Sequence, residues 1–118
     1  MNFDIDVNKV VNDMLQASAG ELIKGGKKAS EYATHEYASF IADIQHVQTM
    51  AEQKIISAAE AQALVNQHKL SMQAVLLAVE GLGLIAVQNA INAALAVLSQ
   101  ALAATLGTAF KSLKFSLV

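Results

Sequence analysis

Apolar residues recur with a helical period along the first eighty residues of the chain. Over residues 29–55 they repeat at alternating steps of four and three, the spacing of a helix that packs along one seam: Ala33, Tyr37, Phe40, Ile44, Val47 and Ala51. A matching repeat follows, formed by Ala61, Val65, His68, Met72, Val75 and Val79. Between the repeats, Ser57 and Glu60 have capping-box spacing, and Ile56 is an apolar staple, so a new helix begins there. We therefore predict an antiparallel helical hairpin over residues 29–80.

A shorter helix is expected before the hairpin, over residues 7–24. Asp4 or Asp6 can cap it, and its apolar side is formed by Val7, Val10, Val11, Met14 and Leu15. Ser18 and Glu21 repeat the capping-box spacing, which predicts that this helix breaks and restarts near Ser18. The pair Gly25-Gly26 ends the helix, because paired glycines readily adopt the left-handed turn of a helix C-terminus.

The last predicted helix, over residues 82–112, is apolar on nearly every side, and residues 81–110 carry no charge. Gly81 and Gly83 stand at its start, where they favour a bend or the close approach of another backbone. Small residues that allow close helix contact recur along it, namely Ala86, Ala90, Ala94, Ala101 and Thr105. Eighty other residues in a thin hairpin are too few to cover such a helix. We therefore expect copies of the chain to associate through this helix and complete the bundle as a homo-oligomer.

These patterns predict one all-α domain over residues 1–118, and composition agrees with long helices. The chain has no proline, where average usage predicts roughly six. It has no cysteine, which excludes disulfides, thiolate metal sites and cysteine nucleophiles. With no arginine and a net charge of −2, it also lacks an electrostatic footprint for nucleic acid. The acidic N-terminus has no basic region before an apolar core, so we expect no cleavable signal peptide.

One group of residues in the hairpin has the chemistry of a metal site. If the turn centres on Ser57, His46 and His68 face each other across the two helices. Asp43 then lies one turn before His46, and Met72 lies one turn after His68. Two imidazoles and a carboxylate suit zinc, iron or copper, and a thioether favours copper(I).

A second group lies farther from the turn. Glu31 and His35 are one helical turn apart, and the same register brings Glu80 opposite Thr34. Glu80 stands alone in an apolar stretch, and apolar surroundings raise the pKa of a carboxyl group. Glu31, His35 and Glu80 therefore form a second, weaker candidate for metal ligation or proton transfer.

Both groups also have a purely structural explanation. In the first group, His68 bonds Asp43 or Gln45 across the seam, and His46 is half exposed. In the second group, Glu80 ends its helix at the surface. Without a Glu-x-x-His pair the chain does not meet the ligand pattern of di-iron bundles.

The function expected from these patterns is non-enzymatic self-assembly, with the uncharged C-terminal helix as the oligomer core. The chain has no Gly-x-Ser-x-Gly turn and no dinucleotide or P-loop fingerprint, so no enzyme class is indicated. Two alternatives stay open. One is a membrane-active protein, pore-forming or holin-like, that inserts residues 82–110, a stretch long enough to cross a bilayer. The other is a metal-binding bundle that uses Asp43, His46 and His68.

Overall fold

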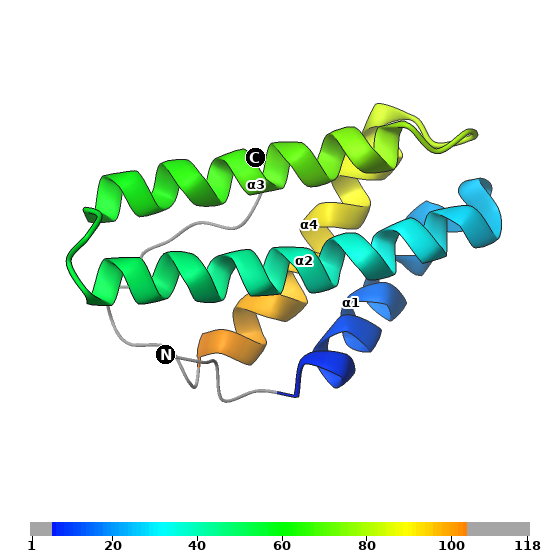
Figure 1. Cartoon of the computed structure of the whole chain (residues 1–118). Helices are drawn as coiled ribbons and strands as arrows, with labels where there is room; N and C mark the ends of the chain where they lie inside the picture. The colour runs from blue at the N-terminus through cyan, green and yellow to red at the C-terminus, as the bar shows by residue number, and fades with distance from the viewer. Residues whose placement is uncertain (1–5, 104–118) are drawn as a thin grey trace.

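The computed structural model describes residues 6–103, and within this range the chain is helical with no strand (Figure 1). The elements are α1 (Val7–Leu22), a short 3₁₀ helix η1 (Ile23–Gly25), α2 (Gly26–Glu52), α3 (Ala58–Leu77) and α4 (Leu84–Ala103). The all-α prediction is therefore confirmed for the described residues. The predicted helix 82–112 begins two residues late as α4, and residues 104–112 lie outside the described range.

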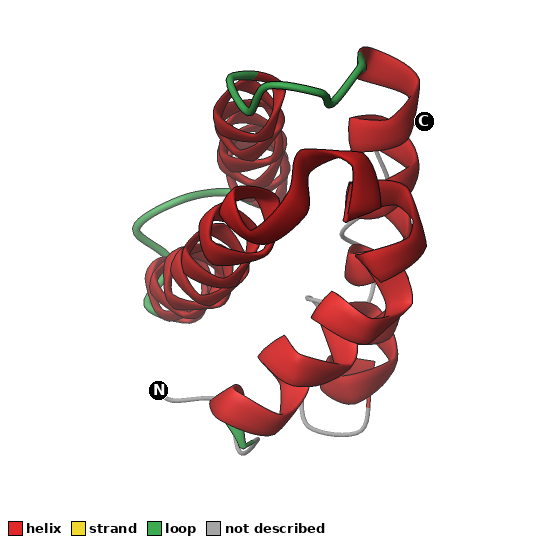
Figure 2. Ribbon diagram, turned by 90° about the vertical axis from the view of Figure 1, so that its right-hand side faces the viewer, coloured by secondary structure: helices red, strands yellow, loops and turns green. Residues whose placement is uncertain are grey.

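The four α-helices form two pairs. Helices α2 and α3 make the predicted antiparallel hairpin, and α1 packs closely on α4. In Figures 1 and 2 the two pairs form two layers that cross at an angle. Helix α1 also packs on α2, whereas α3 and α4 contact each other only sparsely. The helices are thus neighbours in the order α3, α2, α1, α4.

The hairpin forms along the predicted seam. Most seam residues of both helices are buried, and the exceptions are half-buried: Ala51, His68 and Val75. At the start of α3, the Ser57 hydroxyl accepts from the Glu60 backbone N–H at 3.1 Å, and the Glu60 carboxylate accepts from the Ser57 backbone N–H at 2.9 Å. Both bonds satisfy donors that a helix N-terminus leaves without partners. The predicted capping box is therefore confirmed.

Helix α1 does not break at Ser18, so that prediction is wrong. The Ser18 hydroxyl donates to the Met14 carbonyl at 2.8 Å within the helix and accepts from the Tyr37 hydroxyl of α2 at 2.9 Å. Burial raises the pKa of the Tyr37 phenol above its usual range, and the hydrogen bond to Ser18 offsets part of this rise. Ser18 thus joins α1 to α2 instead of capping a helix. The cap of α1 is Asp6, which accepts from the Lys9 backbone N–H at 3.2 Å.

Two glycines hold the α1–α2 turn against the turn between α3 and α4. Gly81 has φ +94, and a Cβ atom there would lie 2.6 Å from the Lys24 carbonyl oxygen. A Cβ atom on Gly25 would lie 3.0 Å from Leu82 and 3.1 Å from Val79. For Gly81 and Gly83 the sequence predicts a bend or a close backbone approach. Both features occur at Gly81, where only glycine fits without strain.

Helix α4 is covered by the chain itself to a greater extent than expected. Its buried residues are Val87, Ala90, Ile91, Ala94, Leu95, Leu98 and Leu102. Its exposed positions are mostly small or polar: Asn89, Ala96, Ser99 and Gln100. We expected that one chain cannot cover this helix. For its large side chains this expectation is wrong, because α1 packs along them. The exceptions are Leu84 and Ile85, which stay exposed.

Candidate functional sites

Asp43 and His68 meet between α2 and α3. The His68 Nδ1 atom lies 3.1 Å from the Asp43 Oδ2 atom, and both side chains are partly exposed. They line a cavity of about 220 Å³ together with Glu36, Ser39, Phe40, Ser71 and Met72. The cavity combines two carboxylates, one imidazole and two hydroxyls with two apolar side chains, Phe40 and Met72. The bond between His68 and Asp43 is the one that the structural explanation predicts.

His46 does not join this group. The hairpin turn occupies residues 53–57, so it centres near Ile55 and not on Ser57. This displacement moves the facing positions by one helical turn, which brings Asp43 opposite His68 in place of His46. His46 is exposed on α2, while Met72 lines the cavity with Asp43 and His68. The predicted set of Asp43, His46, His68 and Met72 is therefore not assembled in this structure.

The second predicted group is dispersed as well. Glu31, His35 and Glu80 are all exposed, and the Nε2 atom of His35 lies 4.0 Å from the Oε2 atom of Glu36. Within residues 6–103, no three side chains of histidine, aspartate or glutamate lie close enough to share a metal ion. The described part of the chain therefore offers no assembled metal centre.

The predicted interface stripe of small residues on α4 lies largely inside the chain. Ala90 and Ala94 are fully buried, and Ala86 and Ala101 are half-buried. Thr105 lies outside the described residues. In this arrangement the buried part of the stripe serves the packing of the chain's own helices.

Helix α3 has a second apolar face, which we call its outer face: Ala63, Leu70, Ala74 and Leu77. Positions 63, 70 and 77 are two helical turns apart and lie on one side of the helix. All four outer-face residues are exposed, Leu70 to 60%. The buried residues Ala61, Val65, Met72 and Leu76 occupy the opposite side. Helix α3 is therefore apolar on two opposite sides. Only one of these sides is covered within the described chain.

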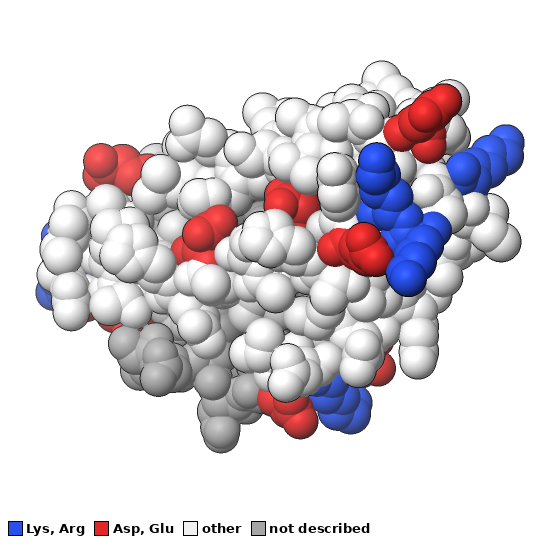
Figure 3. Space-filling model, turned by 45° about the vertical axis from the view of Figure 1, so that its right-hand side comes forward, with Lys and Arg blue, Asp and Glu red and all other residues white. Residues whose placement is uncertain are grey.

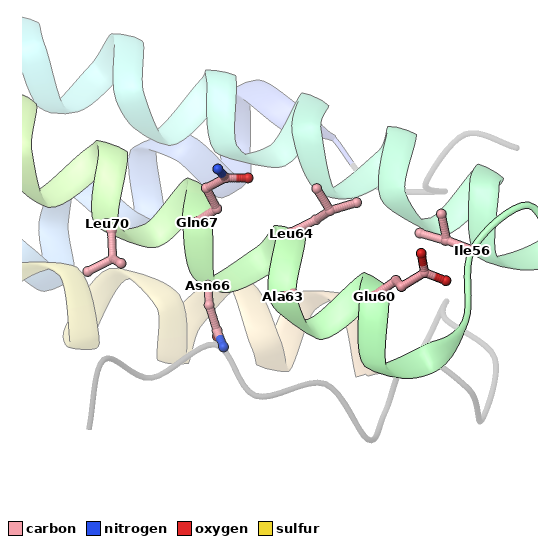
Figure 4. Close-up of a pocket in the computed structure, with 7 residues that line it drawn as sticks. All are labelled: Ile56, Glu60, Ala63, Leu64, Asn66, Gln67 and Leu70. Atoms are coloured by element: carbon pink, nitrogen blue, oxygen red, sulfur yellow. The ribbon is translucent and has the colours of Figure 1, made fainter.

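A groove of about 630 Å³ runs along the first half of this outer side (Figure 4). We call it the α3 groove; its lining residues are Ile56, Glu60, Ala63, Leu64, Asn66, Gln67 and Leu70. Figure 4 shows them in a row, with Ile56 and Glu60 at one end and Leu70 at the other. Glu60 is the one charged residue among them. The hydrogen bonds to Ser57 lower the pKa of the Glu60 carboxyl group.

Charge is distributed unevenly over the surface. Lysine side chains gather where α1 meets α2, with acidic side chains beside them (Figure 3). Residues 61–103, by contrast, contain one lysine, Lys69, one acidic residue, Glu80, and no arginine. Lys69 is 5% exposed, and burial lowers the pKa of its amine. The outer side of α3 beyond Glu60 and the exposed side of α4 are therefore uncharged.

Three features of the structure were not predicted from the sequence: the outer face of α3, the burial of Lys69 and the burial of Gln48. The seven-residue spacing of Ala63, Leu70 and Leu77 signals the outer face, but the stronger seam repeat of α3 masked it. Burial of Lys69 and Gln48 has no local signal. The Gln48 Nε2 atom donates to Glu52 at 3.2 Å, while its buried Oε1 atom has no hydrogen-bond partner within the described residues.

No family model matches the chain, and no curated protein and no solved structure shows significant similarity to it. Any functional conclusion therefore depends on the geometry and chemistry of the sites described above.

Proposed function

We propose that this protein is a non-enzymatic helical protein that assembles with copies of itself through the outer face of α3. The observation that supports the proposal is the pair of opposite apolar sides on α3, one buried against the chain and the other exposed with Leu70 at its centre. A helix that is apolar on opposite sides is normally covered on both. A second copy covers the outer side without any unseen component.

The structure changes the surface that we assign to assembly. Helix α4 was the expected oligomer core because it carries no charge, but its large side chains are packed on α1. What α4 exposes beyond Leu84 and Ile85 is alanine, serine and amides, which gain little from burial. The outer face of α3 exposes Leu70 and Leu77 along an uncharged stripe, whereas the exposed large side chains of α4, Leu84 and Ile85, lie together at its first turn.

The stripe suits an isologous helix–helix contact. Large and small side chains alternate along it, as Ala63, Leu70, Ala74 and Leu77, so that leucines of one copy can pack beside alanines of the other. A twenty-residue helix is only about 30 Å long, and the contact is therefore small. Small interfaces bind weakly, so we expect a reversible dimer.

Sedimentation velocity of the detergent-free full chain tests this proposal. We expect a monomer–dimer equilibrium between about 1 and 500 µM protein. The substitution Leu70→Glu places a charge at the centre of the contact. It should weaken dimerisation by at least about 2 kcal/mol, or about thirtyfold in Kd.

Ile85→Glu is the matched control, since Ile85 is 75% exposed on α4 and lies off the α3 outer face. This variant should dimerise like the wild type. Circular dichroism of both variants checks that helix content is unchanged. A wild-type chain that stays monomeric at every concentration would contradict the proposal, as would equal weakening by the two substitutions.

A second candidate function is membrane insertion by α4. Its segment Leu84–Leu102, 19 residues, is long and apolar enough to cross a bilayer by length and composition alone. Insertion requires α4 to leave α1, which exposes the apolar side of α1, including Met14 and Leu22. Leakage of dye from liposomes at micromolar protein would support this function. Full dye retention together with detergent-free solubility would exclude it.

A further inference from the structure

We propose that the α3 groove is a docking site for the C-terminal segment of the same chain, residues 104–118, and that this segment competes with a second copy. The groove and the outer face share Ala63 and Leu70, so one occupant excludes the other there. Docking itself does not depend on assembly. The competition rests on the proposed function.

The chemistry of the segment matches the groove. Its apolar residues Leu106, Phe110, Leu113 and Leu117 are spaced four, three and four apart, the pattern of one helix face. Its charged residues are Lys111 and Lys114, with no acidic side chain. The groove is lined by four apolar residues, by the amides Asn66 and Gln67, and by one carboxylate, Glu60. The apolar residues of the segment thus match the apolar part of the groove, and its lysines match the carboxylate.

The length of the segment is sufficient. The described chain ends at Ala103, the last residue of α4, and fifteen residues follow. Fully extended, fifteen residues reach about 50 Å, which exceeds the 42 Å long axis of the molecule. Gly107 lies near the start of the segment, where it permits a reversal of chain direction. In extended form the segment is therefore long enough to reach the groove on the same molecule.

Tethering favours the chain's own segment over that of another molecule. A short flexible tether gives an effective concentration of about 1 mM, well above the protein concentration in most experiments. A dimer forms only when the groove is free in both protomers. If the segment occupies the groove in about two thirds of the molecules, one third are free, and the apparent dimer Kd rises about ninefold. The segment thus restrains assembly without abolishing it.

Paramagnetic broadening in the full chain tests the docking, and the absence of cysteine makes the labelling specific. A nitroxide is attached through Ala59→Cys, an exposed position beside the groove and outside its lining. At protein concentrations below the dimer Kd, we expect it to broaden the backbone amide signals of residues 110–117. A nitroxide attached through Ala17→Cys, exposed on α1, is the control and should leave them sharp.

A mixed sample separates the two sources of the segment. Spin-labelled protein without ¹⁵N is combined with ¹⁵N-labelled protein that carries no spin label, so only contacts between molecules broaden signals. We expect no broadening of residues 110–117 in this sample at low concentration. Broadening in the mixed sample alone would overturn the proposal, because the occupant would then be a second copy. Absence of broadening in both samples would overturn it too.

The competition is tested with Leu113→Glu/Leu117→Glu, which should remove the broadening and lower the dimer Kd by about tenfold. Ser112→Glu/Ser116→Glu adds the same charge beside the apolar positions and is the matched control, with an expected Kd change under about threefold. Broadening without dimerisation of any variant would contradict the proposed function and leave the docking intact. Dimerisation without broadening in the wild type would contradict the docking alone.

Discussion

Helices α3 and α4 each span twenty described residues and have similar compositions, but they differ in which side chains they leave exposed. Helix α4 has no charge at all, yet its large side chains lie almost entirely on the side that packs on α1. Helix α3 carries two charges and distributes its leucines over two opposite sides, so Leu70 and Leu77 remain exposed. The placement of large side chains around a helix therefore indicates an open surface better than the absence of charge does.

The difference arises from what each helix packs against. Burial of apolar area stabilises in proportion to that area, so a helix rich in alanine gains little on its alanine side. One neighbour, α1, is enough for α4. Helix α3 has one close neighbour, α2, and its outer face stays exposed within the described chain.

The largest difference between the two helices is expected in the free energy of unfolding, when a buried leucine of α4 is truncated. Leu98 is fully buried, so Leu98→Ala should lower the free energy of unfolding by about 2–5 kcal/mol. Leu70→Ala on the outer face of α3 should change that free energy in the monomer by less than about 0.5 kcal/mol. Urea unfolding of dilute protein measures both. Equal losses would mean that α4 and the outer face of α3 are covered alike.

A second test addresses the turn that joins the two helices. Gly81→Ala adds a Cβ atom against the Lys24 carbonyl at φ +94, and should cost about 1–3 kcal/mol in unfolding free energy. Gly20→Ala is the matched control, because Gly20 lies in α1 with open space around it and alanine should stabilise the helix by about 0.5–1 kcal/mol. If the two substitutions shift the urea midpoint alike, the close contact between the turns does not exist in solution.

The start of α3 is stabilised locally, whatever covers its outer face. Removing the cap with Ser57→Ala should lower the free energy of unfolding by about 1 kcal/mol. Since Ser57 does not belong to the outer face, the loss should be the same above and below the dimer Kd. Urea midpoints at two protein concentrations measure this. A loss seen only in the dimer would place Ser57 in the contact.

The smallest effect is a pH dependence at the same cap. Hydrogen bonds from Ser57 lower the pKa of Glu60 in the folded state. A carboxyl group with a lowered folded pKa adds stability above its unfolded pKa, and this contribution is lost as pH falls through the folded value. Glu60→Gln should therefore flatten the acid side of the curve of unfolding free energy against pH. An unchanged slope would exclude the charged cap.

The hairpin was predictable because its signals are local. The seam from Ala33 to Val47 and the Ser57–Glu60 box depend only on spacing and on neighbouring residues. The register was not predictable to better than one turn, since α2 ends at Glu52 and the turn centre moves with that end. Hence Asp43, not His46, lies opposite His68.

Contacts between distant segments were beyond the reach of these patterns. Ser18 resembles a capping residue, but its partner is Tyr37, nineteen residues away. The cover of α4 depends on α1, and nothing in the spacing of either helix specifies that pairing. The same holds for the candidate sites. Of the residues that line the Asp43–His68 cavity, the spacing pointed to Asp43, His68 and Met72 but not to the others. The α3 groove was not predicted, because it is visible only in the folded chain.

Dilution of ¹⁵N-labelled full chain, followed residue by residue in the amide spectrum, tests most directly which helix mediates assembly. The account predicts concentration-dependent shifts at Ala63, Leu70, Ala74 and Leu77 on the outer face of α3. Asn89, Ala96 and Gln100, which α4 exposes, should keep their positions. Shifts confined to α4, or a spectrum that does not change from micromolar to millimolar protein, would contradict it.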